Sequence, residues 1–530
     1  MTSTRTPVLI VGGGLVGLSA AIFLASHGVR SLLVERRTSS SAHPRALGYT
    51  ARTCELFHTV GMDAAFPQVP KGSGPRRVRA ESLAGQWFEE YPWTPATEAA
   101  PTVEYSPFIG SATAQDRLEP LLRAKAVELG VEVWLGAELT SFTQHATGVA
   151  AVVQGSDRST SVVSAAYLLA ADGHRSPVRE ALGIARDGIE HLQTMRSVLF
   201  CAPLQEYLAR GVVQFLIDQP ELNAFLTSYG GEGRWALMFH DDVERDEQQL
   251  RAAINLAIGR DDVAVNILAT GRWDISALIA DSFASGRVFL AGDAAHTLPP
   301  SRGGYGVNTG IADTHNLAWK LAAVLSGAST PALLDTYDQE RRPVAWKRLK
   351  NIFARPDYAA YARDGFVDTE ITDDAAMEFG QLYRSAAVLD ADASLPAALR
   401  PDQWAGQPGT RAPHLWVQRD DEQISTLDLF GHDWVLLATD ERWRTAATQA
   451  STALGIPVSF VGVGTDVLAD PEKVCAAYGF SHDGSSLIRP DGHIAWRSTR
   501  LPSDAAGTLV HALAHVSSSR RPAAAKGPQV

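Results

Sequence analysis

The sequence predicts an α/β protein in which a Rossmann-like parallel sheet is joined to an antiparallel-sheet domain. Three stretches carry this prediction: VLIVGGGLVG at residues 8–17, a second strand–glycine–helix stretch at residues 286–321, and short strand-like runs at residues 190–275. Strands that alternate with helices favour a parallel sheet, whereas strands that follow one another favour an antiparallel sheet.

The opening stretch combines a strand, a glycine turn and a helix. Val8 to Val11 is an apolar run rich in β-branched residues, and Leu15 to Ala25 has the apolar pattern of a buried helix. Between them, Gly12, Gly14 and Gly17 complete the pattern G-x-G-x-x-G. Such a turn exposes backbone N–H groups at the positive end of the helix dipole, and its glycines let a pyrophosphate approach closely. The stretch therefore predicts dinucleotide binding.

The next strand candidate adds an acidic residue. Ser31 to Val34 ends at Glu35, which lies 18 positions after Gly17. A carboxylate near this position binds a ribose hydroxyl in dinucleotide-binding units. The basic loop that follows contains Arg36 and Arg45. We expect these arginines to neutralise cofactor phosphates or to stand near the reacting centre, the alternative being an ordinary solvated loop.

Length and charge narrow the class of protein. The 530 residues exceed what one core needs, so we expect two or three domains. A net charge of −12 argues against broad nucleic-acid binding and against attraction to anionic membranes. The N-terminal apolar stretch is interrupted by glycines, which is not typical of a signal peptide. No apolar run approaches the roughly 20 residues that span a bilayer, so the sequence predicts a cytoplasmic protein.

Cysteine and histidine positions predict no metal site. Cys54, Cys201 and Cys475 are scattered and form no C-x-x-C pair. The spacing of His296 and His315 matches no familiar pair of metal ligands. We therefore expect inert thiols in a reducing compartment.

Two polar residues between the glycine stretches are candidate ligands of the same cofactor. Gln115 begins a predicted helix at residues 114–129, where its amide could reach a ligand bound by the first domain. Asp172 follows a predicted buried strand at residues 166–171 and precedes Gly173. Asp172 either caps the following helix or holds ligand-bound water.

The strand-rich region predicts a second domain with aromatic side chains. Its runs include residues 197–201, 212–217, 223–229 and 234–240. Phe215, Tyr229 and Phe239 lie on these runs. They either line an aromatic substrate pocket or form an ordinary sheet core.

The second glycine stretch repeats the strand–turn–helix pattern. Val288 to Leu290 is a strand that leads to Asp293, which could accept a hydrogen bond from a cofactor hydroxyl. A proline pair at 299–300 and the glycines at 303–306 constrain the loop, and residues 310–325 predict a helix. A glycine-rich loop before a helix N-terminus can donate N–H groups to an anion or to an electron-rich ring.

Together these motifs resemble those of the class A FAD-dependent aromatic monooxygenases, the para-hydroxybenzoate hydroxylase family. The resemblance rests on the G-x-G-x-x-G unit with Glu35, on Asp172-Gly173, and on Gly292-Asp293 with the proline pair and residues 303–308. Actinomycete aromatic polyketide hydroxylases are the most similar members. The resemblance runs to about residue 400. It implies a glutathione-reductase type FAD domain and a substrate-binding sheet domain.

Residues 401–515 resemble the thioredoxin-like C-terminal domain of the larger family members. The stretches at residues 425–431 and 487–497 carry this resemblance. The C-x-x-C of redox-active thioredoxins is missing, so we expect a structural or dimer-related role. The family usually has Ser-Gly-Gly after the proline pair, whereas this chain has Ser301-Arg302-Gly303-Gly304.

The resemblance also implies residue roles. Pro299 and Pro300 would position the oxygen-transfer face of the flavin, and Arg45 would affect flavin movement or NADPH approach. No side chain is identified as a general base. The implied contacts of FAD are with Gly12, Gly14, Leu15, Val16, Gly17, Glu35, Arg36, Gln115, Asp172, Asp293, Gly306, Val307 and Asn308.

The activity implied is insertion of one oxygen atom from O₂ into a polycyclic aromatic polyketide through a C4a-hydroperoxyflavin, with NADPH as the transient reductant. Two alternatives on the same fold stay open, a Baeyer–Villiger oxygenase and an antibiotic-inactivating oxygenase. A flavin-binding partner without turnover is an alternative of another class. The substrate, the oxidised position, the choice of NADPH or NADH and a homodimeric state are left open.

The predicted domains follow from this resemblance. The FAD-binding domain comprises residues 1–75, 105–190 and 276–345, and the substrate-binding sheet domain residues 76–104 and 191–275. Residues 346–400 form a helical connection, 401–516 the thioredoxin-like domain and 517–530 a disordered tail.

Overall fold

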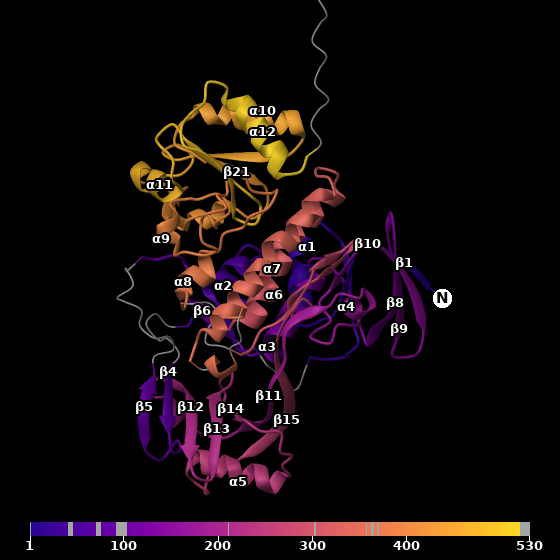
Figure 1. Ribbon diagram of the computed structural model, residues 1–530, viewed down its shortest axis with the longest axis vertical. Helices are drawn as coiled ribbons and strands as arrows, with labels where there is room; N and C mark the ends of the chain where they lie inside the picture. The colour runs from indigo at the N-terminus through magenta and orange to yellow at the C-terminus, as the bar shows by residue number, and fades with distance from the viewer. Residues whose placement is uncertain are drawn as a thin grey trace, which may run out of the picture.

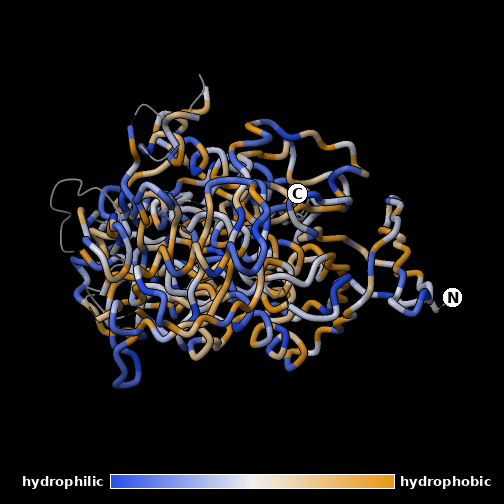
Figure 2. Tube along the Cα trace, turned by 90° about the horizontal axis from the view of Figure 1, so that it is seen from below, coloured by the Kyte–Doolittle hydropathy of each residue, from blue (hydrophilic) through white to orange (hydrophobic). Residues whose placement is uncertain are grey.

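The computed structural model describes residues 2–40, 46–69, 76–91, 103–209, 211–300, 304–356, 358–361, 365–367 and 370–519. These residues form three bodies along the long axis of the molecule (Figure 1). The N-terminal body, which contains β1 and α1, lies in the middle, between the sheet body with its helix α5 and the C-terminal body with α10 to α12. Many hydrophilic segments lie in the peripheral loops (Figure 2). The predicted fold class is confirmed.

A mostly parallel sheet forms the core of the N-terminal body. Its strand order is β16-β17-β10-β1-β2-β7, and all pairs except β16–β17 are parallel. A hairpin of β8 and β9 extends it beside the first half of β10. The strands are β1 (Thr2–Val11), β2 (Ser31–Glu35), β7 (Glu132–Leu135), β8 (Ala137–His145), β9 (Gly148–Gly155), β10 (Thr160–Ala170), β16 (Ala284–Ser285) and β17 (Val288–Leu290). Residues 161–164 and 166–171, predicted as two strands, belong almost entirely to β10.

Helices cover this sheet, and one close helix crossing depends on glycine. The helices are α1 (Leu15–Ser26), α2 (Ala51–His58), α3 (Gln115–Glu128), α4 (Pro177–Ala181), α6 (Tyr305–Leu325) and α7 (Ala332–Phe353). Helix α1 packs against both α3 and α6. A Cβ atom at Gly310 of α6 would lie 2.7 Å from Val16 Cγ2 and 2.8 Å from Gly292 Cα. Only glycine therefore allows α6 to pass this close to α1.

The sheet body contains a second sheet, with one face covered by a helix. Its order is β18-β15-β11-β14-β13-β12-β4-β5, and the pair β4–β12 is parallel while the other pairs are antiparallel. The strands are β4 (Arg76–Ala80), β5 (Trp87–Tyr91), β11 (Arg186–Cys201), β12 (Val212–Gln219), β13 (Leu222–Ser228), β14 (Arg234–Phe239), β15 (Asn266–Ala280) and β18 (His296–Thr297). Helix α5 (Glu247–Ile258) packs on the outer face. A separate antiparallel pair joins β3 (Gly48–Thr50) and β6 (Gly110–Ala112).

The long strands β11 and β15 run through two cores. Ile189 and Ile279, in the part nearer the N-terminal body, belong to its core. Val198 belongs to the core under α5. The predicted boundaries at residues 190/191 and 275/276 therefore fall inside continuous strands, because the chain passes between the bodies without a linker.

The C-terminal body has the expected thioredoxin-like order. Strands β21 and β22 are parallel and joined by α10, and β23 and β24 continue the sheet as an antiparallel hairpin in the order β22-β21-β23-β24. The elements are β19 (Trp416–Arg419), β20 (Glu422–Ser425), β21 (Trp434–Ala438), β22 (Val458–Gly462), β23 (Ser485–Ile488), β24 (Ile494–Ser498), α9 (Pro401–Trp404), α10 (Arg442–Leu454), α11 (Pro471–Tyr478) and α12 (Ala505–Val516).

The connection between the bodies is less helical than expected. Helix α7 passes the predicted boundary at residue 345, and α8 (Asp374–Phe379) is short. Of the predicted tail, residues 520–530 lie outside the described residues, while the backbone oxygen of Ser518 accepts a hydrogen bond from Thr330 N–H at 3.0 Å.

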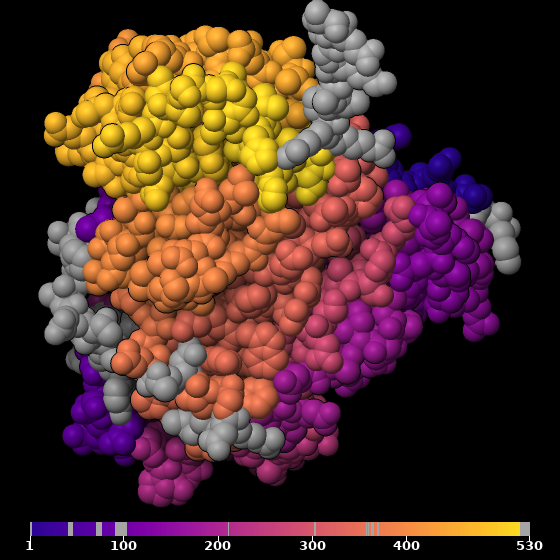
Figure 3. Space-filling model, turned by 45° about the horizontal axis from the view of Figure 1, so that its top comes forward, coloured from indigo at the N-terminus to yellow at the C-terminus, as the bar shows by residue number. Residues whose placement is uncertain are grey.

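A buried ion cluster of Lys320, Glu340, Arg489 and Asp491 joins the C-terminal body to α6 and α7. Arg489 donates two hydrogen bonds to the Glu340 carboxylate at 2.6 and 2.9 Å, and Lys320 Nζ donates to Glu340 Oε2 at 2.8 Å. Arg489 also donates to both oxygens of Asp491. All four side chains are almost completely buried. In Figure 3 the C-terminal body lies directly against the segment that follows α7.

We predict that Gly310→Ala destabilises the FAD-free protein. The added methyl group meets Val16 and the backbone of Gly292, so overpacking should lower the free energy of unfolding by about 1–3 kcal/mol. The matched control on the same helix is Gly306→Ala, where an added Cβ meets no atom within 4 Å. Urea unfolding of both variants checks this, and equal stabilities would contradict the close crossing.

Candidate active site

The predicted cofactor residues gather at one edge of the parallel sheet. Strands β1, β2, β10 and β17 end beside Gly12, Glu35, Asp172 and Asp293, respectively. Since these strands are parallel neighbours, their carboxyl ends meet at this edge. In open α/β sheets, ligands bind outside the carboxyl ends of the strands.

The first turn of α1 offers unpaired backbone donors. Gly14 is the N-cap, it provides no side-chain cap, and the first turn has no acidic residue. A Cβ atom at Gly12, whose φ is +106°, would lie 2.2 Å from the Ala171 oxygen, and one at Gly17 would lie 1.8 Å from the Gly12 oxygen. The glycines therefore hold a turn that other residues cannot form. The N–H groups near Leu15 and Val16 suit a pyrophosphate.

Glu35 is held beside this turn by two backbone donors. Gly13 N–H donates to Glu35 Oε2 at 2.6 Å, and Arg37 N–H donates to Oε1 at 2.8 Å. An ionised carboxylate has about four acceptor sites, so it can still accept from a ribose hydroxyl. Arg36 is exposed next to it, at the edge where a phosphate would lie.

Gln115 and Asp172 are both tied to the protein. Gln115 Oε1 accepts from Ala46 N–H at 3.2 Å, and its Nε2 donates to Glu119 at 2.7 Å. Asp172 Oδ2 accepts from Val178 N–H at 3.1 Å, as a helix cap does, while its buried Oδ1 has no partner in the described structure. Burial raises the pKa of Asp172 above its usual range. Asp172 therefore bonds the first turn of α4, whose N-cap residue is Ser176, and its Oδ1 has no protein partner in the described structure.

The segment from Asp293 to Asn308 forms the second half of the site. Asp293 is exposed within the short helical turn η3 (Gly292–Ala294), and Pro299 is buried next to the exposed Pro300. Helix α6 begins at Tyr305, five residues earlier than predicted, because Gly304 adopts a left-handed N-cap with φ +58°. Its first turn has no side-chain cap and no acidic residue.

Asn308 fixes this helix start with its side chain. Its Oδ1 accepts from Thr50 N–H at 3.2 Å and from Thr53 Oγ1 at 2.6 Å, and its Nδ2 donates to the Gly304 oxygen at 2.6 Å. The backbone at Gly306 faces open space, since an added Cβ there meets nothing within 4 Å. Contact of the N–H groups around Gly306 and Val307 with a bound ring stays a prediction.

A buried Asp–His–Arg contact, which sequence reasoning missed, holds the same segment from behind. Asp313 Oδ2 accepts from Gly292 N–H at 3.2 Å and lies 2.7 Å from His296 Nε2, and its Oδ1 accepts from Arg341 Nε at 2.8 Å. Burial alone would raise the pKa of Asp313, but His296 and Arg341 hold it below its usual range. The sequence signal for this contact is Asp313 itself, a single acidic residue within the apolar pattern of α6.

The predicted aromatic pocket residues divide between the two faces of the second sheet. Phe215 and Phe239 are 0% and 1% exposed and belong to the core under α5, so their prediction as substrate contacts is wrong. Side chains alternate along a strand, and these two point to the covered face. Tyr229 lies in a different cluster with Ala114, and its hydroxyl donates to the Ala46 oxygen at 2.9 Å.

Arg45 lies outside the described residues, as do Ser301, Arg302 and Gly303. In the described parts of the chain, no group of three or more His, Cys, Asp or Glu side chains is placed to hold a metal ion. No helix there has the length and apolar character needed to cross a membrane.

Two protein-family models together match most of the chain. A family model described as FAD binding domain matches residues 5–352. A second, described as aromatic-ring hydroxylase, C-terminal, matches residues 405–519. The glycine cradle, the free helix N-termini and Glu35 therefore fit the cofactor that the first model names.

Curated relatives match over nearly their whole length. Tetracenomycin A2 monooxygenase-dioxygenase of Streptomyces glaucescens is 39% identical over 97% of this chain and 97% of its own. A 4-methyl-5-nitrocatechol 5-monooxygenase of a Burkholderia species is 39% identical over 96% of this chain and 97% of its own. Among solved structures, a ternary complex of aklavinone-11 hydroxylase with FAD and aklavinone matches with a TM-score of 0.88 and 36% identity, covering 98% of this chain and 100% of that one.

We predict that Glu35→Gln weakens FAD binding. The variant loses a charge and replaces one acceptor oxygen by an NH₂ group facing the N–H groups of Gly13 or Arg37. We expect the dissociation constant for FAD to rise about tenfold, which equals ~1.4 kcal/mol. Flavin fluorescence titration of the FAD-free protein measures it. Glu138→Gln, an exposed change on β8, is the control, and unchanged affinity in both variants would exclude the assigned role of Glu35.

Proposed function

Because the chain belongs to the FAD-dependent aromatic-ring hydroxylase family, we propose that it hydroxylates a polycyclic aromatic polyketide, with NADPH and O₂ as co-substrates. The observation that carries this proposal is a pair of helices, α1 and α6, that pack closely at Gly310 and both begin without a side-chain cap. When bound, FAD supplies the chemistry that activates O₂ for transfer of one oxygen atom to the ring.

The chain's own residues bind and orient the cofactor. The donors of the first turn of α1 neutralise the pyrophosphate, and Glu35 accepts from the ribose. Asp293 is exposed at the same edge and suits a cofactor hydroxyl. Backbone donors near Gly306 and Val307 stabilise negative charge on the ring system, because helix N-termini favour anions. Pro299 and Pro300 bound the face next to the ring.

We place the substrate on the inner face of the second sheet, defined as the face opposite α5. Met238 and Trp273 of this face, together with Leu298 and Val307, pack at the edge of the N-terminal core. Val307 belongs to the first turn of α6, so this face adjoins the predicted flavin position. Tyr229 stays a predicted substrate contact on the same face.

Trp273 supplies a polar group for the substrate. Its Nε1 is buried and has no partner in the described structure. A buried N–H without an acceptor is costly, and a carbonyl or hydroxyl of a polyketide provides the missing acceptor. Arg45 stays a predicted residue for flavin movement or NADPH approach, and a homodimer stays a prediction.

The test uses FAD-loaded protein, NADPH, O₂ and a panel of anthraquinone- and angucycline-type compounds. We expect one compound to accelerate NADPH loss and to gain one oxygen atom without matching peroxide. The ring connectivity of the product separates hydroxylation from Baeyer–Villiger insertion. Peroxide alone with every compound would contradict the substrate class, and FAD binding without NADPH oxidation would contradict turnover.

We predict that Trp273→Phe raises KM for that substrate by roughly 2–10-fold, the effect of one net hydrogen bond of about 0.5–1.5 kcal/mol. Peroxide formed per NADPH should also rise, because the substrate is oriented less well. Trp87→Phe is the matched control, since Trp87 packs against Phe215 on the α5 side, with ring centroids 5.3 Å apart. An equal effect of both changes would argue against substrate binding on the inner face.

A further inference from the structure

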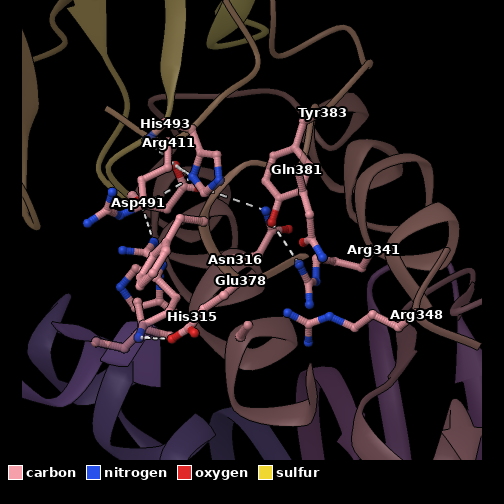
Figure 4. A pocket seen from close by; sticks show the side chains of 14 residues that line it. His315, Asn316, Arg341, Arg348, Glu378, Gln381, Tyr383, Arg411, Asp491 and His493 are labelled. Atoms are coloured by element: carbon pink, nitrogen blue, oxygen red, sulfur yellow. Dashed lines mark hydrogen bonds and ion pairs between the residues drawn. The ribbon is translucent and has the colours of Figure 1, made fainter. Parts of the chain in front are cut away.

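A small cavity of about 30 Å³ lies where α2, α6, α7 and α8 meet the C-terminal body (Figure 4). Four arginines line it, Arg52, Arg341, Arg348 and Arg411. His315 and Glu378 lie on the opposite side from Tyr383 in this view. The cavity lies beside the start of α6, since Arg348 donates to Thr309, the residue after Asn308.

Three of the four arginines have carboxylate partners. Arg341 donates to Asp313 at 2.8 Å. Arg52 and Arg411 share one partner, Glu55, at 2.8 Å and at 2.5–3.0 Å. Two guanidinium groups therefore share a single carboxylate, that of Glu55.

Arg348 has no carboxylate partner in the described structure. Its Nη1 donates to Thr309 Oγ1 at 2.5 Å and its Nη2 donates to the Met377 oxygen at 3.3 Å, whereas its buried Nε has no acceptor. The residue is only 6% exposed. Burial, and then the like charge of Arg341, lowers the pKa of Arg348 to about 10, so it stays charged at neutral pH. An unpaired buried charge is costly, which calls for a counter-ion.

Glu378 is an acidic side chain of the same cavity, but it forms no ion pair with Arg348 in the described structure. Its Oε1 accepts from Arg52 N–H at 2.8 Å, and no ion pair to it is present among the described residues. Burial raises the pKa of Glu378 to about 7. This raised pKa favours the neutral form of Glu378. Asp491, the other carboxylate of the lining, is bound by Arg489, so neither carboxylate pairs with Arg348 in the described structure.

The volume limits the ligand to a very small one. A water molecule needs roughly 10–15 Å³ of such space, so 30 Å³ accommodates one monatomic anion with at most one water. A phosphate group or a nucleotide does not fit. We propose that the cavity binds a small monovalent anion of the chloride type next to Arg348, and that the anion stabilises the seating of the C-terminal body on α6 and α7.

A water-bridged Arg348–Glu378 ion pair is the competing arrangement. It predicts that Glu378→Gln destabilises the protein and that halides have no specific effect. The anion site predicts a halide-specific effect that Glu378→Gln does not remove. Glu378 is a carboxylate without an arginine side chain as partner in the described structure, whereas Asp491, which also lines the cavity, is bound by Arg489.

Crystals of the FAD-loaded protein grown in sodium bromide provide the direct test. We expect a bromide peak in the anomalous difference map within the cavity, close to the Arg348 guanidinium. A map with water at this position and no anomalous peak would overturn the proposal. This test uses the unaltered chain and does not depend on the folding of any variant.

Thermal unfolding provides the second test. At constant ionic strength, replacing sodium gluconate by sodium chloride should raise the Tm by roughly 2 °C or more, because the anion binds only the folded state. Arg348→Gln should lose this increment, and Arg342→Gln, a more exposed arginine on the same helix, should keep it. Glu378→Gln should keep or enlarge it. The same chloride increment in Arg348→Gln as in Arg342→Gln would overturn the proposal.

Discussion

The close crossing of α1 and α6 at Gly310 is the contact on which the rest of the site depends. Helix α1 follows the parallel strand β1 directly, whereas α6 follows β17 after η3 and β18, and both helices begin without a side-chain cap. The two helices cross at a distance that leaves no room for a Cβ atom at Gly310. The same glycine contact reaches Gly292, the residue before Asp293. One packing constraint therefore brings together three segments of the proposed cofactor site.

Buried charges hold α6 in this position from the other side. Asp313 joins Gly292 N–H to Arg341 of α7, and Lys320 joins Glu340 one helix away. Such groups are expensive to desolvate, and removing one partner of a buried pair typically costs about 3–5 kcal/mol. These pairs contribute to structural specificity. If α6 shifted, a buried charge would lose its partner, so other positions of α6 are disfavoured.

Features that depend on a local sequence pattern were predicted correctly. Features that depend on contact with a segment far away in the sequence were not. The glycine turn, Glu35 and the strand at residues 288–290 are local, and the structure agrees with each. Phe215 and Phe239 were misassigned because alternation along a strand reveals two faces but not which one α5 will cover. The partners Glu340 and Arg489 are 149 residues apart, so no spacing rule could have paired them. The helix predicted at residues 310–325 begins earlier, at Tyr305. The glycines at 303–306 suggested a loop, but Gly304 is the N-cap of the helix and Gly306 lies within its first turn.

The C-terminal body contacts the N-terminal body through two arginines. Its Arg411 binds Glu55 of α2, and on the same helix Thr53 donates to Asn308, the residue that fixes the start of α6. Its Arg489 binds Glu340 of α7, which in turn binds Lys320 of α6. The body thus reaches α6 at both ends of its first four turns, by two separate routes. A rigid α6 is what a flavin ring facing its N-terminus requires, because preorganised donors stabilise charge without moving. The charged seating of the C-terminal body and the uncapped N-terminus of α6 are therefore two parts of one arrangement.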